Sequence, residues 1–466
     1  MARPPIPNNV GIENLPARMV EHLEAWRDSY LDWWKWTNLD LEEPIPLRWA
    51  VQRENGDLGF DSGNVKMLEY PWGIWLGPQK SYRHIPYGDH MGEPLWTERQ
   101  DIPAAYLDDL RRLIVQQGDT EPASVEQQRT LGLTAPSDHD RAGLFQVNVE
   151  EGRHLWAMVY LLIRYFGKDG RDESDALLER RSGDPDTGRI LGAFNNPIRD
   201  WLALFCFTTF TDRDGKYQLR AESESAFEPF ACTTDFMLRE EAFHMAFGQN
   251  GIERVVKRTI ELMKTAPHGD VKQVGGIPLD ILQKYINEWY SLSLDLFGGP
   301  DSNNAERLWG RGLKGRDDES KPGRYEDHKL SSGEYVYEAG TPFEKRGSLR
   351  RAMNELLRDE YIKDCAKWLD VWNKQIPDGI PKLYLPDHRF NRSIGMSFYE
   401  GRHYGVRGEV FADAASYEKH RRANLPTEAD YAYVKGLMKR AAGPNKVAFW
   451  LAPPKGKEAE YTYCSK

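Results

Sequence analysis

The sequence predicts a mainly α-helical protein, built on a helical bundle with an N-terminal and a C-terminal extension. Two observations lead to this fold class. Between about residues 101 and 296, several long segments have apolar residues at every third or fourth position, as buried and amphipathic helices do. Two of these segments repeat the pattern Glu-Glu-x-x-His at an interval of 90 residues, which is typical of paired helices around a shared centre.

The composition along the 466 residues suggests four regions. Residues 1–100 form a Trp-rich N-terminal extension, and residues 101–296 form a four-helix core around two metal ions. Residues 297–345 are rich in Gly, Asp, Ser and Lys, and we expect a surface excursion there. Residues 346–466 begin with a helix and continue as a helical and mixed C-terminal region packed on the core.

Seven segments have the periodicity of a helix, at 16–36, 102–118, 142–166, 198–218, 229–247, 278–296 and 346–374. The end of the second segment is open. Either the helix ends at Gly118, or it continues with a kink or a bulge at Pro122, which has no backbone N–H to donate.

The charge and cysteine content argue against several classes of protein and of binding site. Lys and Arg number 62 against 72 Asp and Glu, a net charge of −10, so we expect no nucleic-acid partner. No run of 18 apolar residues and no signal peptide is present, so we expect no membrane span and a cytoplasmic location. Four scattered Cys form neither a disulfide framework nor a zinc site.

The repeated motif predicts a metal centre. In each copy a Glu and a His stand three positions apart, Glu151 with His154 and Glu241 with His244. This spacing puts a carboxylate and an imidazole on one helix face, a turn apart. Two such helices facing each other hold two metal ions when two further helices each add a carboxylate.

The two added carboxylates are expected just upstream of the motifs. Glu121 lies 30 residues before Glu151, and Asp212 lies 29 residues before Glu241. Asp119, Glu126 and Asp214 are weaker candidates, and Glu150 and Glu240 remain alternatives to their neighbours. A third Glu-x-x-His, Glu400 to His403, lies in a glycine-rich stretch, and we interpret it as accidental.

Four carboxylates and two imidazoles are too hard a ligand set for copper(I) and too many ligands for a structural zinc, so iron or manganese is expected. Two iron ions in an apolar bundle suit the reductive activation of O2.

The residues around two of the candidate ligands also resemble a known family. Q-Q-G-D-T-E-P surrounds Glu121 and F-T-D-R-D-G-K-Y surrounds Asp212. With the spacing of the six ligands, the whole chain resembles the oxygenase components of benzoyl-CoA 2,3-epoxidases. The doubled Glu-x-x-His alone is shared with ferritins, ribonucleotide reductase small subunits and bacterial multicomponent monooxygenases.

The resemblance implies a ferritin-like di-iron bundle that epoxidises the ring of benzoyl-CoA with O2, in aerobic benzoate degradation. NADPH would supply electrons through a separate flavin/iron–sulfur reductase. The chain has no Cys cluster and no G-x-G-x-x-G fingerprint where a strand meets a helix, and both absences fit electrons arriving from another protein.

The resemblance also implies residue roles. Glu121, Glu151 and His154 would bind one iron, Asp212, Glu241 and His244 would bind the other, and Glu151 would bridge them. Gln117 would face the cavity, and with Glu151 it is a candidate catalytic residue. Candidate substrate contacts are Gln117, Phe194, Asn195 and Arg199, although the last three could instead belong to the start of a helix.

Three alternatives stay open. The enzyme could act on another acyl-CoA, such as phenylacetyl-CoA. The chain could be a ferritin-like iron oxidase or store, although it is long for a bare bundle. A radical-generating subunit would need a tyrosine beside the metals, for which Tyr160 and Tyr217 are candidates.

Overall fold

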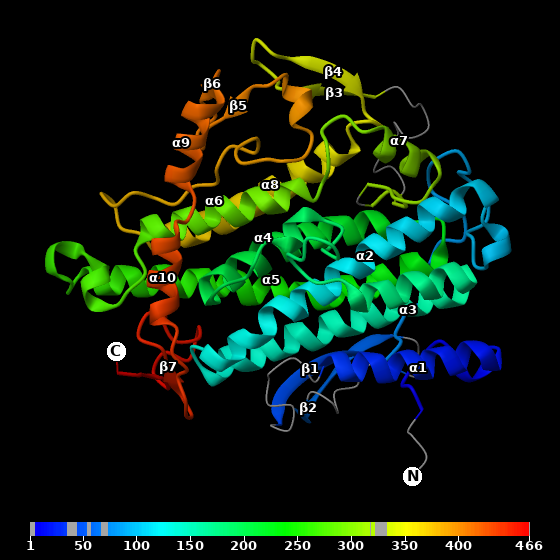
Figure 1. Ribbon diagram of the computed structural model, residues 1–466, viewed down its shortest axis with the longest axis horizontal. Coiled ribbons are helices and arrows are strands. Elements are labelled where there is room, and N and C mark those ends of the chain that lie inside the picture. Colours follow the sequence, from blue (N-terminus) through cyan, green and yellow to red (C-terminus); the bar gives the residue numbers. More distant parts are fainter. Residues whose placement is uncertain are drawn as a thin grey trace.

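Four long helices lie side by side at the centre of the molecule (Figure 1). They are α2 Leu107–Gln128, α3 Asp138–Glu179, α4 Trp201–Glu222 and α5 Glu228–Met263. Helix α2 packs along α3, α4 packs along α5, and contacts between α3 and α5 join the two pairs. The predicted helical bundle is therefore confirmed.

In the computed structural model, residues 5–34, 44–53, 57–66, 73–316, 318–321 and 333–465 are described. The predicted end of the first helix at Trp36, and parts of the regions 1–100 and 297–345, lie outside these residues. Among the described helices, none is long and apolar enough to cross a membrane.

The other helices are α1 Ala17–Trp34, α6 Leu279–Asp295, α7 Asn303–Gly310, α8 Met353–Asn373, α9 Ala414–Asn424 and α10 Glu428–Leu437. Three antiparallel pairs join β1 Ile45–Gln52 to β2 Leu58–Val65, β3 Glu334–Tyr337 to β4 Lys345–Ser348, and β5 His403–Tyr404 to β6 Val410–Phe411. Strand β7 Lys446–Val447 is parallel to β8 Thr462–Tyr463.

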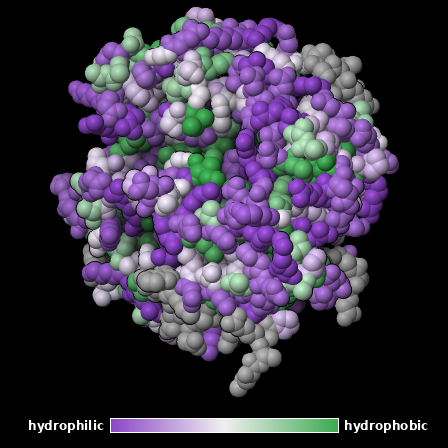
Figure 2. Space-filling view, turned by 45° about the vertical axis from the view of Figure 1, so that its right-hand side comes forward, coloured by the Kyte–Doolittle hydropathy of each residue, from purple (hydrophilic) through white to green (hydrophobic). Residues whose placement is uncertain are grey.

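The bundle is covered on two opposite sides (Figure 1). On one side, α1 packs on α3, with the Trp26 ring edge-on to Trp156 at 4.5 Å between centroids, and β1 contacts α3 and α5. On the other side, α6 and α8 pack against α4. Hydrophilic residues predominate on the face seen in Figure 2, and hydrophobic ones gather in recessed places on it. The middle of the bundle is thus shielded from water.

Helix α2 passes through Pro122 and ends at Gln128, so the possibility that it stops at Gly118 is wrong. It also begins later than predicted, because residues 104–106 form a 3-10 turn before Leu107. Packing along α3 holds the helix across the proline, where sequence preference alone favours a break.

Helix α5 continues to Met263, well beyond the predicted end at residue 247. Gly248 and Gly251 look like a stop signal in the sequence, but they allow α5 to approach α4 closely. A Cβ atom built on Gly248 would lie 2.3 Å from Thr208 Oγ1, and one on Gly251 would lie 2.3 Å from the Phe205 ring.

Two further predictions are settled near the C-terminal end. Helix α8 begins at Met353 rather than at residue 346, because residues 345–348 form β4. The third Glu-x-x-His lies outside any helix, as expected: a 3-10 turn ends at Tyr399, and His403 belongs to β5.

The close approach of α4 and α5 predicts the effect of adding a methyl group. Gly251→Ala should lower the free energy of unfolding by about 1–3 kcal/mol, because the packed interior cannot absorb the extra volume. Gly215→Ala on α4 is the matched control, since a Cβ there meets nothing within 4 Å; it should be neutral or stabilising by about 1 kcal/mol. Denaturant unfolding measures both, and equal effects would contradict the close approach.

Candidate metal centre

The six predicted ligands meet in the middle of the bundle, one carboxylate from each of α2 and α4 and a Glu–His pair from each of α3 and α5. Single ligand atoms of Glu121, Glu151 and His154 lie within 4.8 Å of one another, and so do those of Glu151, Asp212 and His244. Glu151 is common to both groups. Each of the six residues is at most 7% exposed.

Glu241 lies between the two histidines. Its Oε2 is 3.3 Å from His244 Nδ1, and its Oε1 is 3.8 Å from His154 Nδ1. On the other side, Glu121 Oε2 is 3.3 Å from His154 Nδ1. Both histidines therefore turn Nδ1 toward the carboxylate cluster.

The opposite ring nitrogens are held by the first Glu of each motif, across the bundle. His154 Nε2 lies 3.0 Å from Glu240 Oε2, and His244 Nε2 lies 3.0 Å from Glu150 Oε2. A ligand histidine commonly has its second nitrogen fixed in this way, which sets the tautomer and the ring orientation. The doubled Glu of the motif thus has two functions, one carboxylate facing the centre and one orienting the partner helix's imidazole.

The two orienting carboxylates have different neighbours. Arg153 forms a buried ion pair with Glu240 at 3.0 Å and donates to the carbonyl of Ala50 on β1. Glu150 instead accepts a hydrogen bond from the neutral Gln146 amide at 2.9 Å. The carboxylate on the His154 side is therefore paired directly with a buried cation, and the one on the His244 side is bound by a neutral amide.

The pKa directions follow from this burial. Burial, followed by the charge of Glu121, raises the pKa of Glu151 well above its usual range, and burial and Glu241 do the same for Asp212. Burial raises the pKa of Glu150 to about 7. Burial alone would raise the pKa of Glu240 too, but the charge of Arg153 lowers it below its usual value. So many carboxylates in one apolar interior favour a bound cation.

The donor set fits two metal ions. Asp212 Oδ2 is buried and has no hydrogen-bond partner among the described residues, and Glu241 Oε2 and His244 Nδ1, although 3.3 Å apart, form no well-aligned hydrogen bond. Unpaired buried polar atoms are rare and unfavourable. Mixed carboxylate and imidazole ligands suit iron or manganese.

The weaker upstream candidates have other partners. Asp119 accepts from Arg180 and Arg189, and Glu126 accepts from Arg189 at 2.8 Å. Asp214 accepts from Gln218 at 3.0 Å. These contacts separate Glu121 and Asp212 from their acidic neighbours, as the helix-face argument predicts.

Gln117 lies one turn before Glu121 and donates to Glu121 Oε1 at 2.7 Å. It is half-buried and directly supports a candidate ligand. Its contact with substrate stays a prediction.

The other predicted substrate contacts lie at the start of α4, away from the two ligand groups. Phe194 is buried edge-on to Phe207. The Asn195 side chain accepts from the backbone N–H groups of Gly183 and Arg189. Arg199 lies over the Tyr431 ring and pairs with Glu428 at 3.0 Å. Each has a structural partner here, and their roles toward substrate stay predictions.

The sequence reasoning missed Arg153 and the orienting roles of Glu150 and Glu240. The doubled Glu in each motif was the sequence feature that could have indicated the roles of Glu150 and Glu240. Nothing in the sequence separates Arg153, in the middle of E-E-G-R-H, from an ordinary surface arginine.

No protein-family model matches the chain. A curated protein does: benzoyl-CoA oxygenase component B of Aromatoleum evansii is 47% identical to this chain over 464 residues. The alignment covers 96% of this chain and 95% of that protein. Similarity at this level extends through all the helices that form the centre.

The geometry predicts that Glu151 is indispensable for metal binding, because it belongs to both ligand groups. Glu151→Ala should lose both metal ions while the helical content stays unchanged, measured by elemental content and circular dichroism. The matched control is Glu400→Ala in the third Glu-x-x-His, and this variant should keep both metal ions. Retention of two ions by Glu151→Ala would rule out this ligand assignment.

The buried ion pair predicts a stability effect. In the metal-free protein, Arg153→Met leaves the Glu240 carboxylate buried without its cation, so the free energy of unfolding should fall by about 3–5 kcal/mol. Lys168→Met removes the exposed partner of Asp172 and should change the free energy of unfolding by at most about 1 kcal/mol. Denaturant titration distinguishes the two, and similar losses would argue against a structural role for Arg153.

Proposed function

Because the chain belongs to the benzoyl-CoA oxygenase component B family, it is an oxygenase component, and we propose that it epoxidises the aromatic ring of benzoyl-CoA at the 2,3-bond. One atom of O2 enters the ring and the other leaves as water, while NADPH and a proton supply the two electrons and two protons. The proposed role is in aerobic degradation of benzoate.

The observation that carries this proposal is the buried donor set of four carboxylates and two imidazoles in a helical bundle. We propose that the bundle is of the ferritin-like di-iron type. Two iron ions, when bound, supply the reduction and activation of O2. Glu121, Glu151 and His154 would hold one ion, Asp212, Glu241 and His244 the other, with Glu151 shared.

The chain's own residues orient these ligands and keep water out. Gln117 fixes one oxygen of Glu121 by its hydrogen bond, and Glu150 and Glu240 fix the two imidazole rings. Leu155 and Trp156, next to His154, are completely buried. A dry, preorganised surrounding favours a reactive oxidant attacking the substrate instead of solvent.

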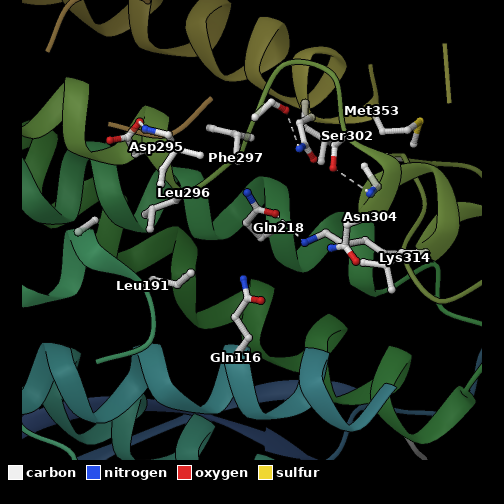
Figure 3. Close-up of a pocket in the computed structure, with 18 of the residues that line it drawn as sticks. Gln116, Leu191, Gln218, Asp295, Leu296, Phe297, Ser302, Asn304, Lys314 and Met353 are labelled. Carbon is white, nitrogen blue, oxygen red and sulfur yellow. Dashed lines mark hydrogen bonds between the residues drawn. The ribbon is translucent and has the colours of Figure 1, made fainter. Parts of the chain in front are cut away.

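We propose that benzoyl-CoA binds in a pocket of 440 Å³ beside α2. Leu113 and Gln116 line it, two turns and a little over one turn before Glu121 on the same helix. In Figure 3, Gln116 points from α2 across the pocket toward Gln218 and Lys314, with Leu296 and Phe297 on one side. A pocket that combines apolar walls with a few polar groups suits a small-molecule ligand.

The electrons would come from a separate flavin/iron–sulfur reductase that uses NADPH. The name "component B" of the similar protein supports a system of several components. Cys206, Cys232, Cys365 and Cys464 stand far apart in the sequence, in no iron–sulfur spacing, which also supports electron delivery by a partner.

The test is to supply the iron-loaded protein with reductase, NADPH, O2 and benzoyl-CoA. We expect oxidation of NADPH that depends on benzoyl-CoA, and a ring epoxide carrying one oxygen atom from labelled O2. Phenylacetyl-CoA is the matched competitor substrate and should be oxygenated far less. Iron uptake and oxidation without any acyl-CoA dependence would instead favour the ferritin-like store.

A further inference from the structure

A second pocket opens beside α3 and α5. It has a volume of 650 Å³ and lies between the first turns of α3, the middle of α5, the start of β1 and the C-terminal segment. Its apolar floor includes Phe243 and Phe247, which are half-buried and stack on each other with ring centroids 6.3 Å apart. We call it the α3/α5 pocket. The proposed substrate pocket uses none of these residues.

A chain of hydrogen bonds leads from this pocket to the metal ligands. Gln146 lines the pocket and donates to Glu150 at 2.9 Å. Glu150 contacts His244 Nε2 at 3.0 Å, and His244 Nδ1 faces the carboxylate cluster. Phe243 also lines the pocket and lies edge-on to the His244 ring, at 6.4 Å between centroids. Gln146 and Glu150 therefore connect the pocket to the candidate ligand His244 by hydrogen bonds, and Phe243 connects it by a ring contact.

The Nε2 contact of the other histidine leads into the interior. His154 contacts Glu240, whose next partner is Arg153, and the Arg153 side chain is 1% exposed beneath β1. None of these three residues lines the α3/α5 pocket or the proposed substrate pocket. The two histidines thus differ in their connection to the α3/α5 pocket.

The lining of the α3/α5 pocket is positively charged, in contrast to the chain as a whole. Four cations line it, Arg141, Arg254, Lys455 and Lys457, against the two carboxylates of Asp138 and Asp140. The whole chain carries −10.

Two of the four cations have carboxylate neighbours in the lining, and the other two are exposed. Arg254 is bound by Asp140, and Arg141 lies 3.8 Å from Asp138. Lys455 and Lys457 are exposed at the rim, where Lys455 lies 3.6 Å from Glu253. A local excess of positive charge attracts a partner with an acidic face.

We propose that the acidic face of the electron-donor component docks over the α3/α5 pocket, and that electrons reach the centre through Gln146, Glu150 and His244. The inference rests on the proposed function, which requires such a donor. The reduced flavin or iron–sulfur group of the donor would supply two electrons, one for each of the two ferric ions that the six ligands would hold. The apolar floor and cationic rim then act as an interface that shares no lining residue with the substrate pocket.

The first test reverses the charge of the rim. Lys455→Glu/Lys457→Glu should weaken binding of the oxidised reductase at low salt by about tenfold or more, and should remove most of its salt dependence. Calorimetry on metal-free and iron-loaded full-length protein measures this without turnover. The matched control, Lys363→Glu/Lys367→Glu, reverses two exposed charges on α8 that do not line the pocket, and should bind normally.

The second test follows reduction of the iron-loaded protein by absorbance. Gln146→Met should slow reduction by the reductase several-fold at saturating donor, while reduction by dithionite stays at the wild-type rate. Reduction by the reductase at the wild-type rate in this variant would overturn the electron path.

The proposed docking surface would be wrong if both double variants bound the reductase equally well. It would also be overturned if Lys455→Glu/Lys457→Glu changed only self-association of the chain or the binding of a small anion. Failure of the proposed function is separable: wild-type protein would then fail to oxygenate benzoyl-CoA even after reduction by dithionite, while reductase binding would still report on the surface.

Discussion

The structure depends on one constraint, the burial of many ionisable groups at a single point in an apolar bundle. Four carboxylates and two imidazoles face one another there, and each residue is at most 7% exposed. Burial raises the pKa of two of these carboxylates, Glu151 and Asp212, well above its usual range, so the apolar interior disfavours their charged forms. With two divalent cations, the same groups become a satisfied ligand set. The surrounding helices hold these six side chains in place.

Close packing and crossed hydrogen bonds provide that rigidity. Gly248 and Gly251 bring α5, which carries Glu241, into direct contact with α4, which carries Asp212. The pairs Glu240–His154 and Glu150–His244 tie α3 to α5 at the level of the ligands. Fixed outer partners of this kind hold ligand rings in the orientation that the metal requires. The N-terminal helix and the β1–β2 hairpin, remote in sequence, close the same region.

The repeat made the centre predictable, because a Glu and a His three positions apart leave little choice of helix face. Glu121 and Asp212 followed from nearly equal spacing, 30 and 29 residues before the two motifs. Helix phase turns Asp214 away from Asp212, whereas only a tertiary contact, with the backbone N–H of Ile190, shows why Asp119 turns elsewhere. The helix ends were harder to predict. Gly251 and Pro122 locally favour the end of a helix, but packing against a neighbouring helix overrides this preference. The sequence alone does not show which segment will pack there. Arg153 was missed for the same reason, since its partners Glu240 and Ala50 come from distant segments.

The most direct test of the central claim is anomalous X-ray scattering at the iron edge on crystals of the iron-loaded protein. The account predicts two iron peaks inside the bundle, one among Glu121, Glu151 and His154, the other among Glu151, Asp212, Glu241 and His244. Both histidines should bind through Nδ1, with Nε2 still on Glu240 and Glu150. A single peak, or iron bound elsewhere while these carboxylates remain metal-free, would contradict it.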